Sequence, residues 1–148
     1  MEVYRITLAK WADKLVASGR AARWNSADRF VIYSASSRAL ACLENVVHRT
    51  GRGLQADFRA ICLHFPDTLP ITTIPLETLP PNWSDYENYT VCQQLGDAWL
   101  DSRATAILRV PSAIVPAEYN YLFNPQHPDF TSVLIKCVEP FQFDSRIK

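Results

Sequence analysis

The sequence predicts a single α+β domain over residues 1–148, with a central twisted β core and flanking helices. Strand-like and helix-like segments follow one another irregularly, which favours an α+β arrangement over a regular βαβ repeat. Of the 148 residues, 48% are hydrophobic and 20% are charged, a composition typical of a globular domain large enough to bury a core. Neither a repeat nor a low-complexity linker divides the sequence.

The first half of the chain carries patterns for two strands and two helices. Apolar residues at helical spacing after residue 8 predict a helix that Gly19 would end. Ser36 and Ser37 can cap a second helix, because a serine side chain accepts a hydrogen bond from the free N–H groups of a first turn. The expected elements are, in order, a strand over 3–7, a helix over 8–19, a polar loop over 20–29, a buried strand over 30–35 and a helix that ends near 48–53.

Prolines interrupt the second half of the chain. Five of them between residues 66 and 81 exclude long regular structure and predict a crossing loop with one short strand. Alternating and helical patterns define the other elements. These are a strand over 57–65, a helix over 84–102, a strand ending in a turn over 105–116, a short strand with a proline-rich loop over 118–130 and a final strand over 132–143.

The second expected helix contains a carboxylate on its apolar side. Leu40, Leu43 and Val47 fall on one stripe, and Glu44 lies only about 40° from Leu40. A carboxylate there gives up hydration and needs a partner or a task. Two interpretations follow: Glu44 reaches solvent or an arginine at the edge of the stripe, or it faces a functional cleft.

Charge and composition exclude several classes of protein. Fifteen basic residues balance fifteen acidic ones, so no overall field favours nucleic acid, although a local basic cleft is compatible with these numbers. The sequence shows no signal-peptide pattern or membrane-spanning apolar run, and its four scattered cysteines are typical of reduced residues in a cytoplasmic protein. The three histidines form no HExxH or similar ligand set, so we expect no metal site.

Several polar residues could form a site, although each also has an ordinary structural interpretation. An arginine beside a tryptophan could bind a ligand or lie exposed in a loop, and a tyrosine at a strand end could belong to the core. Serine and asparagine near turns usually serve those turns. The candidates are Arg23 with Trp24, Tyr33, Ser112, Asn120 and Asn124.

Five motifs in order resemble the RES domain, the toxin half of RES–Xre toxin–antitoxin pairs. The motifs are Arg5, RWN at 23–25, VIYSASSRALACLE at 31–44, VPSAIVP at 110–116 and NYLFNPQHPDF at 120–130. The family is named after an arginine, a glutamate and a serine, which by motif correspond to Arg23, Glu44 and Ser112. The resemblance extends from Tyr4 to about Phe130.

Two departures from the family pattern lie beside these motifs. Members usually have glycines where this chain has Ala22 and Asp28. We expect both replacements to alter the geometry of the loop, and with it the positioning of substrate, rather than the charged groups.

The resemblance implies an ADP-ribosyltransferase-like fold and chemistry on NAD. Breaking the nicotinamide–ribose bond leaves positive charge on the ribose, which a carboxylate in a poorly hydrated pocket stabilises. The planar fork of arginine suits pyrophosphate oxygens, and an aromatic face can hold the cationic nicotinamide. The implied site consists of Glu44, Arg23, Tyr33 and Ser112 as catalytic residues and of Arg5, Trp24 and Asn120 as substrate-binding residues.

We therefore predict a cytoplasmic toxin that degrades NAD as a glycohydrolase or phosphorylase and is neutralised by an Xre-type antitoxin. NAD is the substrate and no cofactor is expected. Water is slightly favoured as the acceptor because no extra basic cluster marks a second anion site, and inorganic phosphate is the alternative co-substrate. DNA contact is expected only through the antitoxin, in a complex that could be of higher order, and membrane contact is not expected. A protein ADP-ribosyltransferase and a non-catalytic interaction domain stay open as other interpretations.

Overall fold

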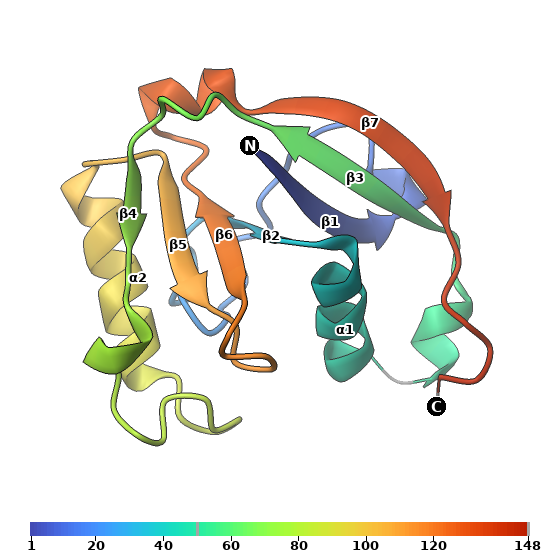
Figure 1. Ribbon diagram of the computed structural model, residues 1–148, viewed down its shortest axis with the longest axis horizontal. Helices are drawn as coiled ribbons and strands as arrows, with labels where there is room; N and C mark the ends of the chain where they lie inside the picture. Colours follow the sequence, from blue (N-terminus) through green and yellow to red (C-terminus); the bar gives the residue numbers. More distant parts are fainter. Residues whose placement is uncertain (50, 148) are drawn as a thin grey trace.

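A computed structural model describes residues 1–49 and 51–147 (Figure 1). Within these residues, seven strands form one mixed sheet with the order β4-β5-β6-β2-β1-β3-β7. Neighbouring strands are antiparallel except for the parallel pair β4–β5. The strands are β1 (Glu2–Leu8), β2 (Ile32–Ala35), β3 (Phe58–His64), β4 (Ile71–Thr73), β5 (Ile107–Pro111), β6 (Tyr119–Phe123) and β7 (Leu134–Phe141). The predicted α+β class is confirmed.

Two α-helices accompany the sheet in the described part of the chain. They are α1 (Arg38–His48) and α2 (Thr90–Ser102). Short 3-10 turns occupy Ala9–Trp11, Gly51–Gln55, Leu76–Thr78 and Pro128–Ser132. Neither α-helix in the described residues is long and apolar enough to cross a membrane.

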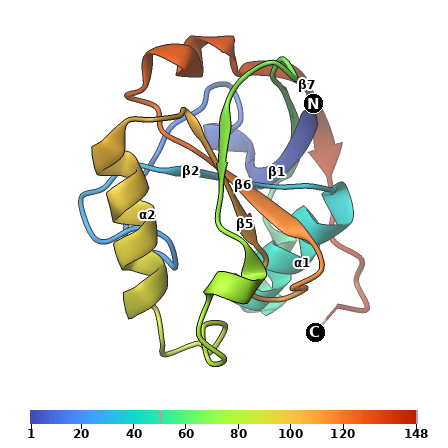
Figure 2. The same ribbon diagram turned by 60° about the vertical axis from the view of Figure 1, so that its left-hand side comes forward.

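The sheet is only weakly continuous between β1 and β2. These two strands are in register at the pair Tyr4–Ala35, whereas β1 and β3 are paired along seven residue positions. Figures 1 and 2 show that β4, β5 and β6 form one wing beside α2, while β1, β3 and β7 form another, with α1 beside the joint. Because few backbone hydrogen bonds close this joint, side chains can occupy it.

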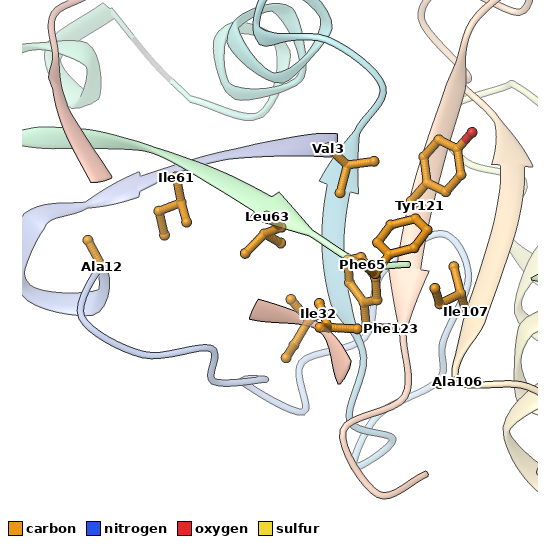
Figure 3. Packing of buried hydrophobic residues seen from close by; sticks show 11 residues of the cluster. Val3, Ala12, Ile32, Ile61, Leu63, Phe65, Ala106, Ile107, Tyr121 and Phe123 are labelled. Carbon is orange, nitrogen blue, oxygen red and sulfur yellow. The ribbon is translucent and has the colours of Figure 1, made fainter. Parts of the chain in front are cut away.

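Buried apolar side chains hold the wings and the helices together. One cluster joins the two wings through Val3, Ile32, Ile107 and Phe123 (Figure 3). A second cluster packs α2 on β5 and β6, and a third packs α1 on β1 and β3. Burying one such side chain contributes about 1.5–3 kcal/mol, so these clusters fix where the two helices lie.

Most predicted elements are confirmed, but the helix expected over residues 8–19 is wrong. Only the 3-10 turn Ala9–Trp11 forms there among the described residues. The rest of the segment packs Ala12, Leu15 and Ala17 against the core, while Trp11 is 54% exposed. A short helix in water is marginal without a fully packed face, and this segment buries its apolar residues better as an irregular connection.

The helix α1 begins where expected, but its buried face differs from the predicted stripe. Ser37 is the cap, since its hydroxyl accepts a hydrogen bond from the N–H of Leu40. Leu40 is buried, but Leu43 and Val47 are 38% and 55% exposed. Helical spacing identifies an apolar stripe but not which of its edges meets the sheet. Here Leu40 and Ala41 pack against the sheet, and Val47 lines a pocket together with Glu44 and His48.

Candidate active site

A pocket of about 720 Å³ lies at the joint between the wings. Its walls come from β1, β2, the loop before β2, α1, and the segment that precedes α2. Six of the seven predicted site residues line it, and these are Arg5, Arg23, Trp24, Tyr33, Glu44 and Asn120. The sheet topology explains this convergence, because β1, β2 and β6 are neighbours although they are distant in sequence.

The carboxylate of Glu44 is anchored through one of its two oxygens. Its Oε1 accepts hydrogen bonds from the Ser112 hydroxyl at 3.0 Å and from the Asn120 amide at 2.7 Å. Its Oε2 lies 3.7 Å from Nε2 of His48, one helical turn further along α1. The Glu44 side chain is 23% exposed. One oxygen is therefore held in place by neutral donors.

The surroundings of Glu44 keep it ionised at neutral pH. Burial by itself would raise the pKa of Glu44, but the His48 ring, the Asn120 amide and the Ser112 hydroxyl outweigh burial and hold this pKa below its usual value of 4.5. Hydrogen bonds to the charged form favour that form. The pocket thus contains a fixed negative charge with restricted access to water.

Ser112 lies behind Glu44 rather than in the pocket wall. It is fully buried. Its Oγ donates to Glu44 and accepts from the N–H groups of Ile114 and Val115 at 3.1 and 3.2 Å. The hydroxyl therefore serves the turn after β5 and orients the carboxylate at the same time.

The two asparagines among the candidates have different environments. Asn120 lies on β6, donates to Glu44, and has a buried Oδ1 without a hydrogen-bond partner among the described residues. Asn124 accepts a hydrogen bond from the N–H of Gln126 and serves the turn that follows β6. Of the two, Asn120 belongs to the candidate site.

The two predicted arginines are already engaged with backbone carbonyls. Arg5 donates to the carbonyl of Tyr33 at 3.0 Å and so bridges β1 and β2 across the joint. Arg23 donates to the carbonyls of Trp83, Ser84 and Asp85 at 2.6, 3.1 and 3.4 Å. Both side chains line the pocket, and both also hold its walls together.

Tyr33 connects β2 with the preceding loop. Its hydroxyl donates to Oδ1 of Asn25 at 2.6 Å and accepts from the N–H of Trp24 at 3.2 Å. Burial, the largest cause, raises the pKa of the Tyr33 phenol well above its usual 10, so the hydroxyl keeps its proton. Trp24 borders the pocket, but it is only 2% exposed and its side chain belongs to the core.

The loop that carries Arg23 is held by unusual local geometry. The backbone of Asp28 has φ 63°, the left-handed conformation that glycine adopts most readily. Gly96 of α2 lets that helix approach the loop, because a Cβ at this position would lie 1.8 Å from the Trp24 carbonyl oxygen. Asp28 therefore occupies a backbone conformation that favours glycine, the residue that the RES resemblance leads one to expect at this position.

The pocket is basic although the whole chain is neutral. The sequence patterns did not single out His48, Arg20 and Arg49, which line the pocket together with Arg5 and Arg23. Glu44 is the one acidic residue among the described residues that line it. The helical spacing of Glu44 and His48 could have revealed one of these neighbours. The pocket therefore contains basic residues beyond the two that were predicted. The argument that favoured water over phosphate as the acceptor, which assumed no such residues, no longer applies.

No metal centre accompanies this arrangement in the part of the chain that the structure describes. No group of three or more histidine, cysteine, aspartate or glutamate side chains there is placed to hold a metal ion. The side chains around Glu44 are instead suited to charge stabilisation and anion binding.

Comparison with known proteins links the pocket to a family. The RES domain profile matches residues 2–144. A protein named Prs ADP-ribosylating toxin, from Sphingobium sp. (strain YBL2), is 37% identical over 142 residues, covering 92% of this chain and 88% of the relative. A protein of Pseudomonas putida named Toxin Res is 39% identical over 127 residues, 84% of each chain. A Yersinia enterocolitica protein, also named Toxin Res, is 33% identical over 154 residues and is covered completely.

A solved structure shares the fold. A chain in the crystal structure of the M. tuberculosis MbcT–MbcA toxin–antitoxin complex matches with a TM-score of 0.76 and 20% identity. The match covers 95% of this chain and 84% of that chain.

Proposed function

Because this chain belongs to the RES domain family, we propose that it is the toxin of a toxin–antitoxin pair and that it cleaves the bond between nicotinamide and ribose in NAD. Three of its relatives carry the word toxin in their names. The observation that carries the chemical part of the proposal is the anchored, ionised carboxylate of Glu44 in an otherwise basic pocket.

Glu44 supplies the negative charge that this reaction needs. When the N-glycosidic bond breaks, its electron pair leaves with neutral nicotinamide and positive charge develops on the ribose. A carboxylate that is already fixed stabilises this charge without reorganising. Ser112 and Asn120 hold one carboxylate oxygen, and Oε2, whose neighbour in the pocket is Nε2 of His48 at 3.7 Å, is the oxygen that would stabilise the ribose.

The arginines of the pocket suit the pyrophosphate of the substrate. Four of them line a pocket with one carboxylate, so the local field attracts an anionic ligand such as a pyrophosphate. An acceptor oxygen then bonds to the ribose carbon and loses its proton. Water yields ADP-ribose, and inorganic phosphate yields ADP-ribose-1″-phosphate. An ordered carboxylate at the centre of such a pocket favours an enzyme over a non-catalytic interaction domain.

Transfer of ADP-ribose to a protein is the second candidate function. It is supported by the relative named Prs ADP-ribosylating toxin, which is 37% identical to this chain. The same Glu44 would stabilise the same charge, and a nucleophilic side chain of the target would replace water or phosphate. The two functions differ only in the acceptor.

The experiment that tests the proposal measures nicotinamide release by the purified chain from NAD, with and without phosphate and without other proteins. Glu44→Gln serves as the inactive control. Cleavage under these conditions supports NAD degradation, and the product identifies the acceptor. If nicotinamide is released only when cell protein is added and labelled ADP-ribose becomes attached to it, transfer is the function. No release in either case would refute both.

The antitoxin is the proposed partner. The structurally similar chain was crystallised in a toxin–antitoxin complex, and the RES resemblance suggests a partner of the Xre type. A carboxylate of the antitoxin would pair with arginines such as Arg5 and Arg23 in a poorly hydrated pocket and exclude the substrate.

A further inference from the structure

The rim of the pocket carries an aromatic side chain that the reaction at Glu44 does not use. Tyr86 is 80% exposed, the largest exposed fraction among the large hydrophobic side chains of the described residues. It lines the same pocket as Glu44. Exposing an aromatic ring to this extent leaves apolar area in water, so a ring held at the mouth of a pocket is available for a ligand.

Tyr86 stands on a segment that is tied down. Its neighbours Trp83, Ser84 and Asp85 supply the three carbonyls that accept hydrogen bonds from Arg23. Its ring meets that of Tyr89 edge to face, with centroids 6.4 Å apart. The Tyr89 ring lies in turn against the Arg23 guanidinium, 4.5 Å from its centroid. Tyr86 therefore has a defined place despite its exposure.

The other aromatic side chains of the pocket have less freedom to stack with a ligand. Trp24 is buried in the core, and the hydroxyl of Tyr33 is bonded within the wall. One face of Tyr4 is occupied by the Arg38 guanidinium, 4.5 Å from the ring centroid. Among the described residues of the pocket, Tyr86 thus presents the most accessible ring.

We propose that Tyr86 stacks against the adenine of NAD and is a specificity-determining residue for the dinucleotide. This inference rests on the proposed cleavage of NAD. The scissile bond must reach Glu44, so the adenosine half lies toward the mouth of the pocket. Figures 1 and 2 show α1, which carries Glu44, and the segment before α2, which carries Tyr86, at the same end of the molecule. Bases stack on aromatic side chains because each has a flat π face.

The proposal predicts an effect that depends on the presence of adenine. Tyr86→Ser should raise KM for NAD about 5- to 30-fold, the lower part of the range for loss of one base stack because the ring is exposed, and should leave kcat nearly unchanged. Tyr86→Phe keeps the ring and should resemble the wild type. The KM for nicotinamide mononucleotide, which has the scissile bond but no adenine, should be the same for all three proteins.

The control is Trp11→Ser, which removes another exposed ring outside the pocket and should change neither KM. Equal KM values of Tyr86→Ser and wild type for NAD would overturn the proposal. An equal rise in KM for both substrates would also overturn it, because Tyr86 would then act on the shared half. If Tyr86→Ser impaired only modification of a protein acceptor, the ring would belong to that acceptor's contact surface.

Binding of AMP separates failure of this inference from failure of the proposed function. If the wild-type chain cleaves neither substrate, the proposed function fails, and calorimetric titration with AMP still tests the stack. The wild type and Tyr86→Phe should bind AMP more tightly than Tyr86→Ser by the same 5- to 30-fold. Equal affinity of all three proteins for AMP, or no binding to any of them, refutes the stack.

Discussion

Replacing Glu44 with glutamine removes one charge and almost no volume. The glutamine carbonyl can occupy the position of Oε1 and accept the hydrogen bonds from Ser112 and Asn120, which are now 3.0 and 2.7 Å long. The change therefore leaves the anchor intact and places a neutral amide at the position of Oε2, beside His48. We expect Glu44→Gln to fold normally.

The expected kinetic cost follows from what is lost. Removing one preorganised electrostatic group typically lowers kcat by about 10²–10³, or about 2.7–4 kcal/mol in the barrier. Because arginines in the wall are held by backbone carbonyls, binding of the pyrophosphate should survive and KM should change little. The loss should appear in kcat.

The pH dependence follows from the lowered pKa of Glu44. A carboxyl group with a lowered folded-state pKa stabilises the folded protein above its usual pKa near 4.5, and this contribution is lost as the pH falls through the folded-state value. Since Glu44 is partly exposed, the contribution is expected to be below about 1 kcal/mol. The stability difference between wild type and Glu44→Gln should therefore shrink in acid, and kcat of the wild type should fall over the same range.

The assay combines nicotinamide release with urea unfolding at several pH values. Glu77→Gln is the matched control, because it removes the same charge from an exposed glutamate outside the pocket. A folded Glu44→Gln protein with near wild-type kcat would refute the assignment of Glu44 to charge stabilisation and return it to a structural role.

Four further perturbations test the pocket and its control. Arg23→Lys keeps the charge but loses the planar fork that donates to three carbonyls, so KM for NAD should rise roughly tenfold. Unchanged kinetics would show that Arg23 has no role in substrate binding. Gly96→Ala places a Cβ 1.8 Å from the Trp24 carbonyl oxygen and should lower the free energy of unfolding by about 3 kcal/mol or more. Its control, the exposed helical change Ala98→Gly, should lower this free energy by only about 1 kcal/mol. Equal urea midpoints for the two variants would contradict this packing. Asp28→Gly should stabilise the fold by a few tenths to about 1 kcal/mol, since φ is positive at this residue. A lower stability in urea unfolding would mean that the aspartate side chain supports the turn. Removing the last residues of the antitoxin should restore NAD cleavage in an assembled complex, and persistent inhibition would locate control elsewhere.

Local patterns in the sequence predicted most of the secondary structure. Alternating and helical spacings, the Ser37 cap and the proline-rich crossing loop all recur in the structure. These features depend on residues within a few positions of one another. The segment over 8–19 failed for the opposite reason, because its apolar residues meet partners on distant strands and those contacts replaced the helix.

The sequence by itself also indicated Glu44, because a carboxylate beside an apolar stripe requires compensation, and the family motifs brought in the rest of the site. Only the tertiary structure decided how the site is assembled. Ser112 and Asn120 are 68 and 76 residues from Glu44 along the chain, and the arginines of the pocket wall come from β1, the loop before β2 and the end of α1. Hydrogen bonds and charges act through space over a few ångströms, so a neutral composition could conceal a basic pocket until the sheet brought its residues together.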